Sequence, residues 1–265
     1  EEDCFRQIPV LKKHLPMVKF LQLDDGYQTV IKPPGHPPQR MQIDFLYKND
    51  IPFDRTKFPG GPTGYVKKCK QAGLRPAIWL GLLATTHGRM LTEHPDWILH
   101  TDSGRPLSFY SASYGGTSVL DPSVPGVRRY IDYVCRKTFR DWGFEGVKLD
   151  FSSTAFESKR IRFRYPGKTA REWRKYLTDT FRKYLPQDGF FGWCTTCSTG
   201  DPLLAPDADY FRNAEDIGKG HWEKVKRIAC WCVNTNVLMP ERPVYPNIDS
   251  IGISRNFSEQ EWISW

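Results

Sequence analysis

No run of apolar residues in this 265-residue chain approaches the roughly 18 residues that cross a membrane as a helix. Residues 1–20 carry scattered charges and lack the apolar core of a signal peptide, so they do not indicate a cellular compartment. Internal repeats and low-complexity linkers are also missing. We therefore expect no membrane partner, and the compartment is left open. The length suits one large α/β domain as well as two small ones, because α/β barrels often form single domains of roughly 250 residues.

RNA-binding and zinc-finger patterns are likewise missing, although the net charge of +8 would suit a nucleic-acid partner. Acidic residues are plentiful outside one basic run, which we interpret as the solvated face of a helix. We expect no nucleic-acid partner; the alternative, a basic nucleic-acid-binding module, predicts binding that weakens steeply with salt. The run consists of Lys159, Arg160, Arg162, Arg164, Lys168, Arg171, Arg174 and Lys175.

The chain also lacks the even number of cysteines that a disulfide framework requires, because it has seven. Cys194-x-x-Cys197 with Cys230-x-Cys232 would suit a zinc site, and Trp193–Cys197 superficially resembles a thioredoxin motif. The second spacing is short for zinc, and the flanks of the redox-like motif lack the expected helix start. We expect most cysteines to be buried free thiols, and we expect neither a metal nor a cofactor.

The chain is organised around one short stretch, Gly146–Phe151, which is predicted to be a buried strand with charged residues at its end. Residues two apart on a strand point the same way, so Lys148 and Asp150 share a face. A charged pair is costly at an apolar interface. We therefore expect the strand to open into a cavity, as the strands of a (β/α) barrel do at their carboxyl ends.

Apolar segments alternate with amphipathic ones along the chain, a pattern typical of a parallel sheet with right-handed crossovers. The best fit is a (β/α)8 TIM barrel truncated after about the seventh strand, with residues 1–265 as one incomplete catalytic domain. A doubly wound open sheet is the alternative, but no Gly-rich phosphate turn follows the first strand. The expected strands are Met17–Leu23, Pro76–Leu80, Ser118–Leu120, Gly146–Phe151, Phe190–Cys194, Ala208–Arg212 and Asn236–Met239, and the expected helices are Thr63–Gln71, one from Val127 to Trp142, Trp173–Leu185, Trp222–Cys232 and one from Ser258.

Carboxylates follow three of these strands: Asp24 with Asp25, Asp150, and Glu215 with Asp216. In a barrel these strand ends meet at one mouth. Two well-placed carboxylates are what glycoside hydrolysis requires, one to attack the anomeric carbon and one to protonate the leaving oxygen. Mg²⁺ would also suit such oxygen ligands, but the lysine beside Asp150 reduces the negative charge of the site.

Five motifs lie at these strand ends and in the loops between them: Leu23–Tyr27, His94–Trp97, Leu120–Pro122, Val147–Asp150 and Arg212–Ile217. Together they resemble the α-galactosidase clan of glycoside hydrolases (clan D, families 27 and 36). In order, they are similar to the acidic pair of the first strand, two motifs of family 36, the nucleophile strand, and the acid/base segment of lysosomal family 27 members. Each motif alone is weak, whereas their order and spacing are specific and cover nearly the whole chain.

The resemblance implies a retaining glycoside hydrolase that removes terminal α-linked galactose, or a related sugar, from an oligosaccharide or glycoconjugate. Asp150 would be the nucleophile and Asp216 the general acid/base, with carboxyl groups about 5–5.5 Å apart. Lys148 would keep Asp150 ionised. The implied sugar-binding residues are Asp24 and Asp25 as acceptors, Lys148 as a donor, Arg212 as a support of the sugar or the acid/base, and Trp79 as an apolar wall.

Simpler interpretations stay open for these side chains. Asp150 and Asp216 could be helix N-caps, and Asp24 or Asp25 could be a turn former. Arg212 could be a structural ion-pair partner, and Trp79 a core residue. A non-catalytic carbohydrate-binding barrel and a transglycosylase of the raffinose-synthase kind are alternatives to a hydrolase. The oligomeric state is open, and a homo-oligomer is compatible with the sequence.

Departures from the family 36 pattern concern the sugar pocket. Cys197–Asp201 keeps the start of a Gly-rich segment but lacks its glycine run and its sugar-binding arginine. Leu149 stands where Trp or Tyr is common, and Ser152 where Asn or Cys is common. We therefore expect the clan's chemistry, whereas the sugar, its 2-position substituent and the linkage stay open.

Overall fold

The computed structural model describes residues 2–31, 40–41, 53–86, 88–111, 114–157, 160–194, 208–212, 218–219 and 251–252, together with Glu223, Lys226 and Cys230. The chain divides into two compact units, Glu1–Phe191 and Gly192–Trp265. Most of the candidate site residues belong to the first unit.

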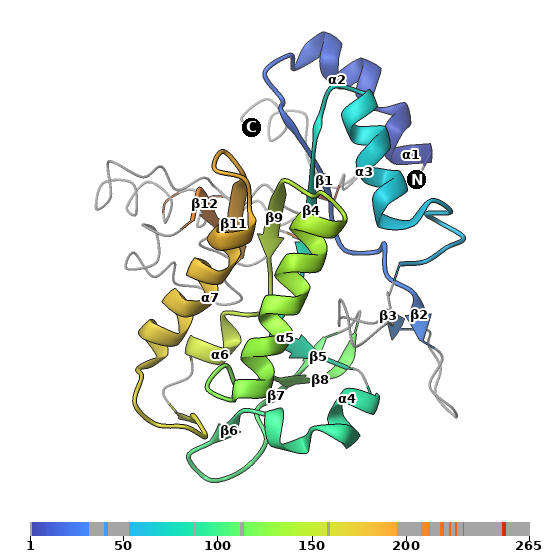
Figure 1. Cartoon of the computed structure of the whole chain (residues 1–265). Helices are drawn as coiled ribbons and strands as arrows, with labels where there is room; N and C mark the ends of the chain where they lie inside the picture. The colour runs from blue at the N-terminus through green and yellow to red at the C-terminus, as the bar shows by residue number, and fades with distance from the viewer. Residues whose placement is uncertain are drawn as a thin grey trace. The chain divides into compact units, whose positions relative to one another are not determined.

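A parallel sheet forms the centre of the first unit (Figure 1). Strand β1 (Phe20–Leu23) pairs with β4 (Arg75–Leu80), and β4 pairs with β9 (Gly146–Leu149). Strand β11 (Phe190–Cys194) begins next to β9, where the Phe190 amide donates to the carbonyl of Glu145 at 3.1 Å. The pairings of β1 with β4 and of β4 with β9 are parallel, which confirms the predicted parallel sheet. Strands β4 and β9 are also buried almost throughout, as strands covered on both faces are.

Each connection between these strands contains a helix that packs on the sheet. Helix α3 (Gly61–Gln71) lies between β1 and β4, α5 (Pro125–Cys135) between β4 and β9, and α7 (Ala170–Tyr184) between β9 and β11. Helix α5 continues as a π-helical segment, η2 (Arg136–Asp141), and it lies beside α7 (Figure 1). The buried residues recur at helical spacing, with Val127, Ile131 and Val134 on α5 and with Trp173, Leu177 and Phe181 on α7.

Two glycines end helices as the sequence predicted. Gly73 follows α3 with a φ of 68°, and Gly143 follows the η2 segment with a φ of 80°. Only glycine adopts such left-handed backbone without steric strain, so each marks the point at which the chain turns back to the sheet.

The prediction that Ser118–Leu120 forms the third strand of a barrel is wrong. Strand β8 (Gly115–Val119) runs antiparallel to β5 (Ala84–Thr85) and to β7 (Ser108–Ser111), in a separate three-stranded sheet. Burial along β8 alternates, which is typical of an antiparallel strand with one solvated face. The chain therefore passes from β4 through this small sheet and α5 to β9, the next strand of the central sheet.

The interpretation of the basic run as one helix face is wrong for its first half. Arg162 lies in β10 (Ile161–Arg162), which pairs with β6 (His100–Thr101). Helix α7 begins after Thr169, whose side chain forms a capping box with Glu172. Arg174, within α7, is buried.

The remaining elements are short. Strand β12 (Tyr210–Arg212) pairs with β11 in the second unit, in register Cys194↔Arg212. Three residues of the predicted helix Trp222–Cys232 are described, and all three are helical: Glu223, Lys226 and Cys230. The predicted strand at 236–239 and the helix from Ser258 lie outside the described residues. None of the helices that the structure describes has the length and apolarity to cross a membrane. The other elements are α1 (Glu2–Arg6), α2 (Ile8–His14), β2 (Val30–Ile31), β3 (Arg40–Met41), α4 (Gly88–Glu93), η1 (Pro95–Trp97), α6 (Thr154–Glu157), β12 (Tyr210–Arg212), β13 (Gly218–Lys219) and β14 (Ile251–Gly252).

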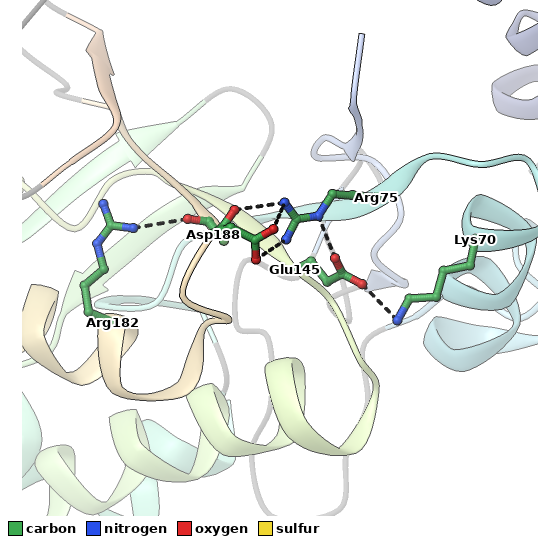
Figure 2. A network of polar contacts seen from close by, with 6 residues as sticks. Lys70, Arg75, Glu145, Arg182 and Asp188 are labelled. Carbon is green, nitrogen blue, oxygen red and sulfur yellow. Dashed lines mark hydrogen bonds and ion pairs between the residues drawn. The ribbon is translucent and has the colours of Figure 1, made fainter.

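A network of ion pairs joins the amino ends of β4 and β9 (Figure 2). Arg75 Nε lies 2.7 Å from Glu145 Oε2, and Lys70 Nζ lies 2.9 Å from Glu145 Oε1. Arg75 also donates to Asp188 Oδ1 at 3.0 Å and to the Asp188 carbonyl at 2.9 Å, while Arg182 donates to the Gly189 carbonyl at 3.2 Å. The network ties α3, two strands and the loop before β11 together at the end of the sheet opposite the candidate site.

We expect Glu145→Gln to lower the free energy of unfolding by about 1–2 kcal/mol at pH 7, the cost of breaking charge-assisted bonds in a partly buried network. Partial burial raises the pKa of Glu145, but the bonds and charges of Lys70 and Arg75 outweigh it, so the net pKa is lowered. The stabilisation is therefore present above the ordinary pKa of about 4.5 and is lost as the pH falls through the folded-state value.

Urea denaturation at pH 7 and at pH 3 measures this effect. The matched control is Asp179→Asn, which breaks an exposed pair with Lys175 on α7 and costs about 0.5 kcal/mol or less. Equal losses for the two variants at pH 7, or an undiminished Glu145→Gln loss at pH 3, would contradict the assignment.

Candidate active site

Three neighbouring strands bring polar residues to one level at their carboxyl ends. Trp79 on β4 is paired with Lys148 on β9, and Leu23 of β1 is paired with Ile78. Asp24, one residue beyond Leu23, therefore falls at the level of Trp79 and Lys148. Paired residues of parallel strands point to the same face, so these side chains converge as the sequence predicted. Asp150 stands two residues beyond Lys148 and shares that face.

At the level beneath them, β4 and β9 carry small residues. Ala77 of β4 is paired with Gly146 of β9, and a Cβ added to Gly146 would lie 2.9 Å from the Ala77 Cβ and 3.2 Å from the Phe190 Cβ. Such a contact is closer than carbon atoms pack, so a side chain at 146 would push the strands apart. The strands are therefore closely packed at this level, and the polar residues lie one level further, at the carboxyl ends of the strands.

Lys148 and Asp24 form an ion pair at the centre of the site. Lys148 Nζ lies 2.9 Å from Asp24 Oδ2, and the side chains are 5% and 41% exposed. Gln22 Nε2 donates to the same oxygen at 2.6 Å, and the Asp25 amide donates to Asp24 Oδ1 at 2.9 Å. Both oxygens of Asp24 are therefore held, and the carboxylate has one defined orientation.

Asp150 is 7% exposed and accepts hydrogen bonds on both carboxylate oxygens. Trp79 Nε1 donates to Oδ2 at 3.1 Å, and the Phe151 amide donates to Oδ1 at 2.8 Å. Trp79 itself is buried, and its carbonyl accepts a hydrogen bond from the Tyr27 hydroxyl at 2.9 Å. Two N–H donors favour the charged carboxylate. Trp79 thus fixes the orientation of Asp150, a role that the sequence interpretation missed.

The backbone just after Asp150 adopts a strained turn. Phe151 has a φ of 54°, a left-handed value that bulky residues rarely adopt, and the Ser152 amide donates to the Asp150 carbonyl at 2.6 Å. A hydrogen bond between residues two apart defines a γ-turn. The Phe151 ring stacks on Phe109 at 5.4 Å and meets Tyr114 edge-on at 5.8 Å. Packing on the β7–β8 sheet therefore holds the turn that presents Asp150, and such strain is concentrated at functional sites.

Tyr114 was not predicted from the sequence. It lies between β7 and β8, and its hydroxyl donates to Asp25 Oδ2 at 2.8 Å. Its ring stacks on Trp79 at 6.0 Å with an interplanar angle of 13°. Burial, followed by the charge of Asp25, raises the pKa of Tyr114 well above its ordinary value, so the hydroxyl remains a donor. No sequence signal identifies a contact between residues 89 positions apart.

A cavity of about 800 Å³ opens beside Asp24 and Asp25. Its walls come from the end of β1, from the segment before α3 and from α1 and α3. The lining residues are Glu2, Cys4, Gln22, Leu23, Asp24, Asp25, Gly26, Tyr27, Thr56, Lys57, Phe58, Pro59 and Lys68. Both carboxylates are therefore accessible to a small molecule.

The second unit holds the remaining predicted site residues. Arg212 ends β12, and only its backbone is described. Asp216, Glu215 and the segment Cys197–Asp201 lie outside the described residues. The separation between the carboxyl groups of Asp150 and Asp216 therefore stays a prediction.

The structure describes five of the seven cysteines, all as free thiols. Cys69, Cys135 and Cys194 are buried, which agrees with the interpretation of most cysteines as core residues, whereas Cys230 is exposed. Among the residues with described positions, no group of three or more His, Cys, Asp or Glu side chains could hold a metal ion.

Comparisons with known proteins identify similar folds among solved structures, whereas no protein-family model and no curated protein matches the sequence. An α-galactosidase from Thermus thermophilus in complex with stachyose matches with a TM-score of 0.70 and 19% identity, over 100% of this chain and 54% of that chain. A family 36 α-galactosidase from Geobacillus stearothermophilus matches at 0.53 and 19%, over 78% and 27%. A family 31 α-xylosidase from a soil metagenome matches at 0.59 and 13%, over 89% and 33%.

This chain spans about half the length, or less, of these proteins. At these identities the comparisons concern the fold. The structural neighbours are the α-galactosidases to which the sequence motifs pointed, together with a family 31 enzyme. The chain therefore has an α/β fold with a parallel central sheet that is similar to the catalytic domains of family 36 α-galactosidases.

Proposed function

We propose that the protein is a retaining glycoside hydrolase that cleaves terminal α-linked galactose, or a closely related sugar, from an oligosaccharide or glycoconjugate. The observation that carries the proposal is the setting of Asp150, a buried carboxylate held by two N–H donors at the end of a parallel strand. The Lys148–Asp24 pair lies at the same end of the sheet. The fold shared with α-galactosidases supports the assignment.

In the proposed reaction Asp150 attacks the anomeric carbon of the sugar and forms a covalent glycosyl-enzyme. Asp216 protonates the departing glycosidic oxygen and then removes a proton from the water that hydrolyses the intermediate. Two displacements at the same carbon return the original anomer. The orientation of Asp150 by Trp79 and the Phe151 amide supports the first step, because a nucleophile reacts fastest from a fixed near-attack position.

The sugar would be bound by the carboxylates beside the cavity. Asp24 and Asp25 would accept hydrogen bonds from ring hydroxyls, and Lys148, already held on Asp24, would donate to a hydroxyl of the same ring. We propose Arg212 as a support of the sugar or of Asp216. Trp79 is buried and its Nε1 donates to Asp150, so we propose that it acts through the orientation of Asp150.

We further propose that residues 1–265 form a catalytic domain of the (β/α)8 barrel type. The parallel order of β1, β4, β9 and β11 supports this arrangement, with the polar residues at the carboxyl ends of the strands.

A panel of nitrophenyl α- and β-glycosides, assayed with the full-length protein, tests the function. We expect the highest kcat/KM on the α-galactoside, and proton NMR should detect α-galactose as the first product. Asp150→Asn is the inactive control. Galactose binding without turnover of any glycoside would instead support a carbohydrate-binding barrel. The β-anomer as first product would overturn the retaining mechanism.

A further inference from the structure

Two adjacent aspartates at the end of β1 are held in different ways. Asp24 is paired with the ammonium group of Lys148, which compensates its negative charge. Asp25 is tied to the hydroxyl of Tyr114, a neutral donor. Burial and then the charge of Asp25 raise the pKa of Tyr114 well above its ordinary value. The tyrosine therefore stays neutral and donates a hydrogen bond through its hydroxyl. Asp25 is thus oriented by a donor that carries no charge.

The position of Asp25 makes this orientation useful. Asp25 is exposed and lines the cavity, whereas Tyr114 is buried. An exposed aspartate ordinarily exchanges between rotamers. The hydrogen bond from Tyr114 favours one rotamer of Asp25. The Tyr114 ring also stacks on Trp79, the side chain that donates to Asp150.

We propose that Tyr114 is a positioning residue that sets the sugar selectivity of the site, by fixing Asp25 to accept a hydrogen bond from one hydroxyl of an uncharged sugar ring. The inference rests on the proposed function and deepens it. A fixed anionic acceptor discriminates strongly against a sugar that lacks the matching hydroxyl, because the acceptor is then left without that bond. A mobile acceptor adjusts and discriminates less.

The test is Tyr114→Phe, which removes the hydroxyl and keeps the ring. We expect KM for nitrophenyl α-galactoside to rise about tenfold while kcat changes less than about threefold, because Tyr114 acts on binding rather than on the reacting atoms. The decisive measurement uses the four monodeoxy nitrophenyl α-galactosides. For one of them, the penalty in kcat/KM that wild type imposes should shrink about 10-fold in the variant, the value of one hydrogen bond to a charged group.

Tyr110→Phe is the matched control. Tyr110 lies on β7 of the same small sheet, next to Phe109 in the strand and therefore on the opposite face, and it is 70% exposed. We expect its KM and its deoxy-sugar penalties to equal those of wild type. Near-UV circular dichroism checks the fold of both variants, and Asp25 can be rehydrated in Tyr114→Phe because it is exposed.

The outcomes separate this inference from the proposed function. Unchanged deoxy-sugar penalties in an active Tyr114→Phe enzyme would overturn the role of Tyr114 and leave the glycosidase assignment intact. If wild type turns over no glycoside, calorimetry with galactose decides: a weaker Kd in Tyr114→Phe alone supports the positioning role without the reaction. Absence of both turnover and galactose binding would overturn both proposals.

Discussion

Replacing Asp150 by Asn should reduce kcat for nitrophenyl α-galactoside by several orders of magnitude, about 10³-fold or more, because the amide cannot form the glycosyl-enzyme bond. The loss should appear in kcat and in kcat/KM alike. Initial rates of wild type and variant, measured at saturating substrate, provide the comparison. A variant that retained more than about a tenth of wild-type turnover would remove Asp150 from the role of nucleophile.

The fold should survive this change at a modest cost. The two donors to Asp150 reach different oxygens, Trp79 Nε1 to Oδ2 and the Phe151 amide to Oδ1. An asparagine offers only one oxygen, so one donor must face its NH₂ group. We expect a loss of about 1–2 kcal/mol in the free energy of unfolding, measured by urea denaturation. An unfolded variant would make its inactivity uninformative, which is why a second variant is needed.

Asp150→Ala is that second variant. Removal of the carboxylate leaves space in which a small anion can bind. Added azide should attack the anomeric carbon of an activated α-galactoside from the vacated face and release nitrophenolate. One displacement inverts the centre, so the product should be β-galactosyl azide, identified by proton NMR. Rescue without inversion, or the same azide response in Asp179→Asn, would contradict the assignment of Asp150.

The sequence was sufficient to predict the framework of the site. An apolar run identified β4, and the short stretch Gly146–Phe151 with its charged end identified β9, as buried strands of a parallel sheet. The carboxyl ends of parallel strands meet at one edge of the sheet. That geometry predicted that Asp24 and the end of β9 would meet at one edge. The 2.9 Å ion pair between Asp24 and Lys148 was not itself predicted. The expectation that Lys148 keeps Asp150 ionised stays a prediction, and the ion pair described for Lys148 is with Asp24.

The rest depended on contacts that leave no local pattern. Phenylalanine rarely adopts positive φ, so nothing in the sequence signals the γ-turn at Phe151. Tyr114 reaches Asp25 because the segment before it folds back as an antiparallel sheet, and that sheet was mistaken for a barrel strand. Short apolar segments such as Ser118–Leu120 suit either strand direction, and tertiary packing decides between them.

The second large effect is expected for Lys148→Met, which keeps the length of the side chain and removes its charge. The site would then hold Asp24, Asp25 and Asp150 without the ammonium group that compensates Asp24. Repulsion among the carboxylates and the lost donor to the sugar should lower kcat/KM for the α-galactoside by about 10²–10³-fold. The exposed Lys175→Met on α7 is the control and should behave as wild type.

Stability should fall less than the burial of Lys148 suggests. Breaking a fully buried ion pair costs about 3–5 kcal/mol, because the remaining charge is left without water. Asp24 is 41% exposed and keeps its bonds from Gln22 and from the Asp25 amide, so water can replace the ammonium group. We therefore expect a loss of about 1–2 kcal/mol in urea denaturation.

A double-mutant cycle with Asp24→Asn separates the pair from its members. Removing both charges leaves no unpaired carboxylate at position 24, so the double variant should unfold at nearly the same urea concentration as Lys148→Met alone, or a higher one. Its kcat/KM should stay as low as that of Lys148→Met, because neither group remains to bind the sugar. Additive losses in stability would mean that the 2.9 Å contact contributes nothing as a pair, and that Lys148 acts on the sugar alone.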